Sequence, residues 1–157
     1  MRLVLRVSQM LALAGVACLL ALALLTIADV LGRFFGRPIP GFVDIATLAT
    51  AVIIPAFFPI LLVRRGNITL RPFEYFGGRG PARYLDIFGS LLTAIFLGLM
   101  AWQFLRYAAE ASTSGERMAV LRWSVAPWWW AVAALVTVAA LVSVAVWIED
   151  LRGRRSE

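Results

Sequence analysis

Four long apolar runs, separated by short clusters of arginine, constrain this chain more than any other feature of its sequence. Each run is roughly 20 residues long, the length that a helix needs to cross about 30 Å of hydrocarbon. The 157 residues are 62% hydrophobic and only 15% charged, whereas soluble domains are on average about 45–50% apolar. The pattern predicts an all-α integral membrane protein with four helices.

The lengths of the runs set the expected boundaries. We expect one membrane domain over residues 1–157, and we expect the first run to be a span because it exceeds the apolar core of a signal peptide. The second run contains Pro55 and Pro59, each of which removes a backbone hydrogen bond, so this helix should bend where it packs on protein. The four transmembrane helices are predicted at about 10–32, 42–63, 84–105 and 126–148.

The basic residues indicate how the chain crosses the membrane. All 15 are arginines, and ten of them fall at the two termini and in the second connection, with five around the first and third connections. Because basic residues favour the cytoplasmic side, both termini should be cytoplasmic. The arginines flank apolar runs instead of forming a stripe, so the expected partners include membrane lipids and exclude nucleic acid.

The sequence offers little chemistry. Histidine is absent, and the single cysteine, Cys18, lies within the first run, where we expect a small buried apolar residue. No nucleophile is paired with a base, and there is no glycine-rich phosphate loop and no cluster of metal ligands, so we expect no catalytic residue, no metal and no cofactor. A self-sufficient ion-coupled carrier would need discontinuous helices or internal repeats with polar groups at the membrane midplane, and the sequence indicates neither.

Two carboxylates stand at the ends of runs. Asp29 precedes Arg33 by four residues, the spacing at which opposite charges meet on one helix face, which predicts a local ion pair. Asp44 lies in the first turn of the second run, where the helix dipole favours a carboxylate. A contact between Asp44 and a basic group on a partner subunit or a neighbouring helix is the alternative.

Small and aromatic residues indicate surfaces for packing. Trp128 and Trp129 belong to a tryptophan cluster at the start of the fourth run, typical of the membrane interface, with a partner-docking platform as the alternative. Small residues at helical spacing allow close packing within the chain or against another subunit, most naturally through the first and third spans. They are Ala14, Cys18, Ala21 and Ala28 in the first run, Gly89, Thr93 and Gly98 in the third, and Ala133, Thr137 and Ala140 in the fourth.

One segment carries a family resemblance. The stretch DVLGRFFGRPIPGFVD, from Asp29 to Asp44, and the Arg64-Arg65-Gly66 sequence after the second run resemble the DctQ-like small permease subunits of TRAP transporters. In that family an arginine-aromatic stretch ends the first span, a Gly-x-Pro-Ile-Pro turn leads to an acidic residue, and a basic-glycine motif closes the second span. This chain departs from the family at two positions, because a glutamate often stands at Asp44 and a histidine where this chain has Asn67.

The resemblance implies a scaffold subunit in the bacterial inner membrane. Such a subunit pairs with a large permease subunit for sodium-driven uptake of an organic acid, which a periplasmic substrate-binding protein delivers. The alternative is a stand-alone four-helix exporter, which would need a carboxylate near the middle of a helix, whereas Asp29 lies near an end. The candidate interface or helix-end residues are Asp29, Arg33, Arg37, Asp44, Arg64, Arg65, Trp128 and Trp129.

Overall fold

The structure is a computed structural model that describes the backbone of residues 2–64 and 79–151 and the side chains of residues 4–64 and 87–151. Within these residues the predicted all-α fold is confirmed, because every regular element is a helix. Four stretches are long and apolar enough to cross a membrane, and α2 and α3 together make up one of them. The helices are α1 (Arg2–Phe34), α2 (Phe42–Ala56), α3 (Phe58–Val63), α5 (Arg79–Ser114) and α6 (Ala126–Leu151).

Two of the helices extend well beyond the spans expected from the apolar runs. Helix α1 has 33 residues and α5 has 36, against expected spans of 10–32 and 84–105. At a rise of about 1.5 Å per residue, each is on the order of 50 Å long, which exceeds the hydrocarbon thickness of about 30 Å. Helices of this length cross a bilayer at a tilt or project beyond it.

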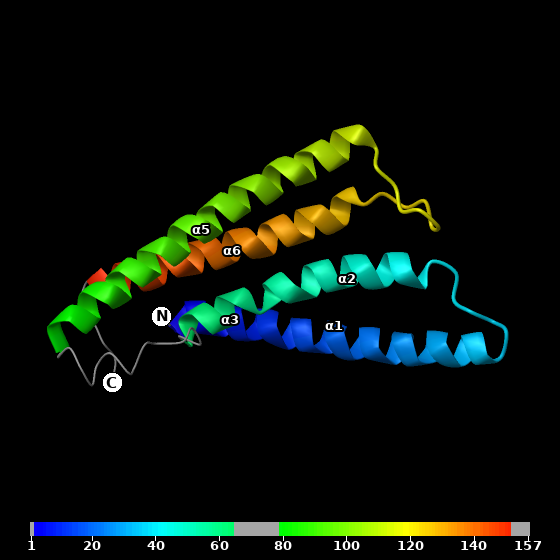
Figure 1. Cartoon of the computed structure of the whole chain (residues 1–157), viewed down its shortest axis with the longest axis horizontal. Helices are drawn as coiled ribbons and strands as arrows, with labels where there is room; N and C mark the ends of the chain where they lie inside the picture. The colour runs from blue at the N-terminus through cyan, green and yellow to red at the C-terminus, as the bar shows by residue number, and fades with distance from the viewer. Residues whose placement is uncertain (1, 65–78, 152–157) are drawn as a thin grey trace.

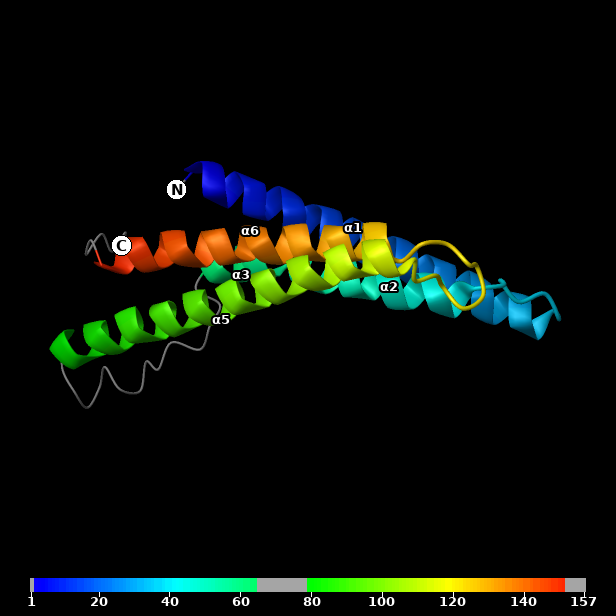
Figure 2. The ribbon, with the colours of Figure 1, turned by 90° about the horizontal axis from the view of Figure 1, so that it is seen from above.

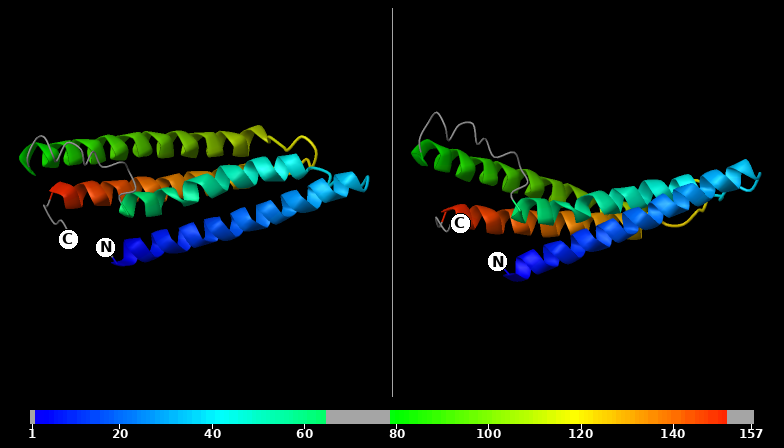
Figure 3. Two further views of the ribbon diagram at one scale, coloured as in Figure 1. Left: turned by 60° about the horizontal axis from the view of Figure 1, so that its bottom comes forward. Right: turned by 90° about the horizontal axis from the view of Figure 1, so that it is seen from below.

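The helices form an open, twisted layer in the order α1, α2/α3, α6, α5 (Figures 1 and 3). Helix α1 packs on α2 and α3, while α6 packs on α2, α3 and α5. In the edge-on view α1 and α5 cross, which shows the twist (Figure 2). Helix α6 is therefore central, with 39% of its most apolar stretch buried, whereas α1 lies at an edge with only 6% buried.

The two ends of this layer differ. Helix α1 begins, and α6 ends, at one end, which we call the terminal end (Figure 1). At the other end lie the two short connections, 35–41 between α1 and α2 and 115–125 between α5 and α6. We call this the loop end. The hydrogen bonds that Asp29 and Asp44 make to other segments lie at this end.

The second span is broken where its two prolines stand. Helix α2 ends at Ala56 and α3 begins at Phe58, with Phe57 between them. Pro55 and Pro59 are both buried, so the bend lies against protein, as the sequence predicted. Gly15 of α1 packs here, because a Cβ atom at Gly15 would lie 3.2 Å from the Phe57 ring.

Helix α1 has one narrow packed face and a broad open one. Its buried residues Ser8, Gly15 and Asp29 follow a seven-residue spacing, with half-buried Leu22 completing the stripe, as in helices that pack along a seam. The expected burial of Cys18 is wrong, because this residue is exposed. The other small residues that the sequence analysis identified on α1 are exposed as well: Ala14, Ala21 and Ala28.

The small residues that the sequence analysis identified are packed inside the layer on α6, whereas the two glycines identified on α5 are not. Ala133 and Ala140 of α6 are buried, and Ala140 belongs to a core cluster that joins α5 to α6. In contrast, Gly89 and Gly98 of α5 are exposed, and neither would meet another atom within 4 Å if it carried a Cβ. The core cluster consists of Leu97, Ala101, Val132, Val136 and Ala140.

Candidate interface at the loop end

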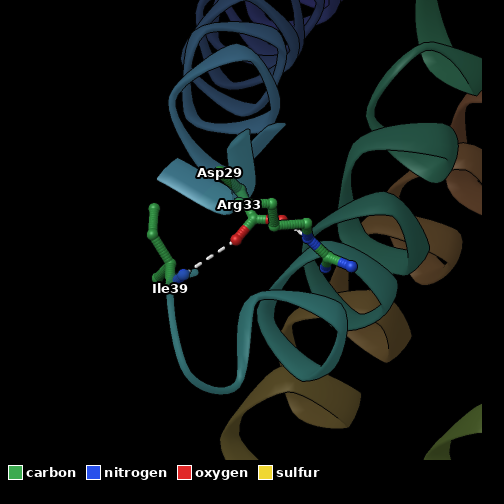
Figure 4. Close-up of polar contacts among 3 residues, drawn as sticks. All are labelled: Asp29, Arg33 and Ile39. Carbon is green, nitrogen blue, oxygen red and sulfur yellow. Dashed lines mark hydrogen bonds and ion pairs between the residues drawn. The ribbon is translucent and has the colours of Figure 1, made fainter. Parts of the chain in front are cut away.

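The first connection is held by the carboxylate of Asp29, which is 1% exposed. Its Oδ2 accepts a hydrogen bond from Arg33 Nε at 2.7 Å, which confirms the predicted ion pair. Its Oδ1 accepts a second bond from the backbone N–H of Ile39 at 2.9 Å (Figure 4). Asp29 therefore ties the end of α1 to the residues that lead into α2, while the Arg33 side chain remains 57% exposed.

The chain reverses direction through tight backbone geometry. The backbone N–H of Arg37 donates to the carbonyl oxygen of Gly32 at 2.7 Å, and a Cβ at Gly32 would lie 2.5 Å from the Arg37 carbonyl oxygen. Gly36 and Gly41 adopt left-handed conformations with φ of +72° and +74°, which L side chains adopt only with strain. The Arg37 side chain is exposed at this turn.

Asp44 connects the first pair of helices to the second. Its Oδ2 accepts hydrogen bonds from the backbone N–H groups of Val120 at 2.8 Å and Leu121 at 3.4 Å. Two successive N–H groups that converge on one oxygen form an anion site of the kind that backbone turns provide. Asp44 therefore contacts a neighbouring segment of the same chain, and its partners there are backbone amides and not the basic group of the alternative prediction.

The second connection, 115–125, folds as a compact hairpin. Met118 N–H donates to the Trp123 carbonyl at 2.8 Å, and Val125 N–H donates to the Glu116 carbonyl at 3.2 Å. Met118 and Val125 are buried against the end of α5. Leu121 packs directly on Gly41, because a Cβ atom added at Gly41 would lie 1.6 Å from the Cδ1 atom of Leu121. This hairpin is thus fixed in place by both α2 and α5.

The two tryptophans identified from the sequence lie within the layer more than on its surface. Trp128 and Trp129 are half-buried and pack against the cluster that contains Met118 and Val125. Trp129 also stacks on Phe104, with ring centroids 6.2 Å apart, and meets Tyr107 edge-on at 4.7 Å. The exposed tryptophans in this region are Trp102, Trp123 and Trp130.

The structure brings four of the predicted site residues together and separates another from them. Asp29, Arg33, Arg37 and Asp44 all lie at the loop end. Arg64 is exposed at the end of α3, toward the terminal end, where its N–H donates to the Ile60 carbonyl at 2.9 Å. Arg65 lies outside the described residues.

The two aspartates at the loop end are occupied by internal contacts, whereas the arginines around them face outward. Arg33, Arg37, Arg117 and Arg122 are all exposed. Among the described residues, no three His, Cys, Asp or Glu side chains converge as metal ligands would. This arrangement is suited to holding helices and loops in a fixed geometry.

Sequence reasoning missed the partners of the two aspartates. Ile39, Val120 and Leu121 contribute backbone N–H groups, and a backbone amide leaves no signature in the sequence. The Pro40-Gly41 pair was the available signal, because such pairs mark turns with φ above zero. It predicts a turn without revealing that Leu121 packs against it.

These features define a multi-pass membrane protein whose charged groups near the helix ends hold connections together. The chain belongs to the family described as "Tripartite ATP-independent periplasmic transporters, DctQ component", which it matches over residues 22–153. It is accordingly a small membrane subunit of a TRAP transporter, and its family is a transporter component family and not an enzyme family. A search of curated proteins and one of solved structures each found no match.

Proposed function

We propose that this chain is the scaffold subunit that pairs with the large permease subunit of a TRAP transporter in the bacterial inner membrane. In this account the pair takes up an organic acid with sodium, and a periplasmic binding protein delivers the acid. Both termini are cytoplasmic, so the loop end faces the periplasm. Family membership supports this role, and the observation that carries it is the open edge at α1, of which only 6% is buried.

The open face of α1 is where we propose that the large subunit packs. Association of helices in lipid depends on close van der Waals packing, to which small residues contribute by letting backbones approach. Ala14, Ala21 and Ala28 repeat every seven residues along this exposed face, and Cys18 lies beside them. A partner helix could therefore follow α1 over most of its length.

The periplasmic binding protein would meet the loop end. Three exposed arginines at the two connections, Arg37, Arg117 and Arg122, form no ion pair among the described residues, and exposed cations favour encounter with a partner of opposite charge. The internal bonds of Asp29 and Asp44 hold both connections in one geometry before any partner arrives. Such a surface fits a scaffold that binds without moving.

A stand-alone exporter is not favoured. That role requires a carboxylate that is free to bind a proton or a cation within the membrane. Asp29 is the nearest candidate, but both of its oxygens already accept hydrogen bonds, from Arg33 and from Ile39. Its place near the end of α1 supports a structural role.

The proposed role can be tested by transport in proteoliposomes that contain the large subunit, with the binding protein and the organic acid added outside. With this chain present, a sodium gradient should drive uptake, and without it uptake should fall to background. If the large subunit alone transported at the full rate, the scaffold role would be wrong. If this chain transported the solute without the large subunit, the stand-alone exporter would become the favoured function.

Crosslinking from Cys18 can test the proposed contact surface on α1. Cys18 is the single cysteine of the chain and is exposed on α1, so a photoreactive maleimide would label one site. We expect illumination of native membranes to link Cys18 to the large subunit. A matched variant, Cys18→Ala with Leu22→Cys, places the thiol on the half-buried face of α1 toward α2 and α3, where no such link should form. Equal linkage from both positions would contradict the proposed surface.

A further inference from the structure

Helix α5 carries polar side chains on an outward face that the other described residues leave uncovered. Gln103 and Arg106 are exposed, although both lie within the apolar span Ile87–Ser114. Polar residues in spans usually face the interior of a helix bundle or a polar partner. These two have no hydrogen-bonding or ionic partner among the described residues. Their N–H groups are therefore available to bind a group outside the described residues.

The Arg106 guanidinium turns toward the apolar part of α5. Its central carbon lies 5.1 Å from the centroid of the Trp102 ring, one turn earlier in the helix. Glu110 stands four residues after Arg106, at the spacing of a helical ion pair, yet no ion pair between them is present. The ring covers one face of the guanidinium, and the N–H groups at its edge remain available for a bidentate anion.

The depth of Arg106 in the bilayer follows from its neighbours on α6. Phe104 and Tyr107, on either side of it in sequence, both contact Trp129, and Ser112 accepts a hydrogen bond from Trp130 at 3.0 Å. Clusters of tryptophan mark the level of the lipid headgroups. Arg106 therefore lies at the headgroup level of the leaflet at the loop end, where the anion most available is a phosphate.

An apolar track continues from Arg106 toward the membrane midplane. Leu99 precedes Arg106 by seven residues, which places the two on the same face two turns apart. Leu99 is 60% exposed and Phe96 is 62% exposed. Arg106 follows Phe96 by ten residues, a rise of about 15 Å along the helix, which matches half of a hydrocarbon core of about 30 Å.

We propose that the outward face of α5 from Phe96 to Arg106 binds one phospholipid of the leaflet at the loop end. The Arg106 guanidinium and the Gln103 amide donate to the phosphate and its ester oxygens. Trp102 holds the guanidinium in place, and an acyl chain lies along Leu99 and Phe96. The site is independent of the role proposed for α1, because α5 forms the opposite edge of the layer.

Native mass spectrometry of the purified full chain tests this site with defined lipids. The probes are phosphatidylglycerol, phosphatidylethanolamine and diacylglycerol with identical acyl chains. We expect one phospholipid to remain bound about tenfold more tightly than diacylglycerol, because diacylglycerol lacks the charge-assisted hydrogen bonds. Free inorganic phosphate at millimolar concentration should not displace it, because the acyl chain contributes to binding. Equal retention of diacylglycerol, or displacement by phosphate, would overturn the proposal.

Variants separate this site from general attraction between arginines and lipid. Arg106→Gln should weaken retention of the phospholipid about tenfold, and Arg106→Lys should weaken it less. Gln103→Leu should also weaken retention, although leucine is well suited to a lipid-exposed helix face, because the variant lacks the amide donor. Arg117→Gln is the matched control, since it removes one exposed arginine from the hairpin at the same end. An equal loss with Arg117→Gln would contradict the site. So would an Arg106→Gln variant that keeps its lipid but no longer recovers a partner polypeptide, because Arg106 would then bind protein.

Discussion

The carboxylate of Asp44 lies 2.8 Å from the backbone nitrogen of Val120, a residue 76 positions away in the chain. This bond joins the start of α2 to the hairpin between α5 and α6, and so links the two helix pairs at the loop end. Gly41 and Leu121 are in contact at the same junction. The geometry of the loop end therefore depends on these two contacts between distant segments.

Loss of the Asp44 carboxylate should loosen the hairpin. In Asp44→Ala the N–H groups of Val120 and Leu121 lose their acceptor, so their hydrogen exchange should accelerate, with a smaller effect in Asp44→Asn, which keeps an oxygen. Hydrogen exchange followed by mass spectrometry over residues 116–125 measures this change. Glu110→Ala removes an exposed carboxylate from α5 and should leave exchange in the hairpin unaltered. Unchanged exchange in Asp44→Ala would refute the link.

A charge reversal at the same position should affect assembly more than insertion. Asp44→Arg places a cation against two N–H donors, which displaces the hairpin while leaving the apolar spans intact. We expect normal amounts of the chain in the membrane fraction but reduced recovery of the complex with its large subunit. Recovery at the wild-type level would show that the hairpin position does not matter for assembly.

Gly41 and Gly36 form a matched pair for testing the contact with Leu121. Both have φ above +70°, so substitution by alanine should cost each about 1–2 kcal/mol in backbone strain. Only at Gly41 would the new Cβ also meet Leu121, at 1.6 Å, so Gly41→Ala should lower the thermal stability further than Gly36→Ala does. In a double-mutant cycle, Leu121→Ala should remove the additional loss of thermal stability that Gly41→Ala shows over Gly36→Ala. Equal effects of the two alanine substitutions would contradict the contact.

Asp29 should order the first connection through its bond to Ile39. Asp29→Ala removes the acceptor of the Ile39 N–H, so exchange of that amide should rise, whereas Asp29→Asn retains an acceptor and should raise it less. Thr26→Ala is a control on the same helix, because the Thr26 hydroxyl donates only to the Leu22 carbonyl of its own helix. If all three variants exchanged at the same rate, the Asp29 bond would contribute nothing to the turn.

The two faces of α1 should separate folding from assembly. Gly15→Leu inserts a side chain against Phe57 and Ala56, and overpacking of this kind costs about 1–3 kcal/mol, so the thermal stability of the isolated chain should fall. Ala14→Leu places a leucine on the exposed face instead and should leave that stability unchanged while weakening recovery of the large subunit. Equal loss of stability in both variants would contradict the assigned faces.

The sequence was sufficient for the parts of the fold that the solvent determines. The thickness of hydrocarbon sets the length of an apolar run, so four membrane spans followed directly, and Pro55 and Pro59 located the bend in the second span. The Asp29–Arg33 pair was predictable because its two members lie one turn apart on the same helix. In each case the information is contained in neighbouring residues.

The remainder depends on contacts that local patterns do not encode. The partners of Asp44 are backbone amides that lie more than 70 residues away, and such amides have no residue type to recognise. The exposure of Cys18 depends on α1 lying at the edge of an open layer, whereas in a closed bundle the same apolar run could bury it. The exposure of Arg106 and Gln103 on an uncovered face was not predictable, because both stand near the end of an apolar run, where polar residues are ordinary.

The most direct test of the scaffold assignment is affinity purification of the tagged chain from native membranes in mild detergent, with mass identification of the polypeptides that accompany it. The account predicts one large multi-span subunit in stoichiometric amount, and reduced recovery of it with Ala14→Leu. A chain that came out alone or as a homodimer, and that moved solute by itself in liposomes, would contradict the account.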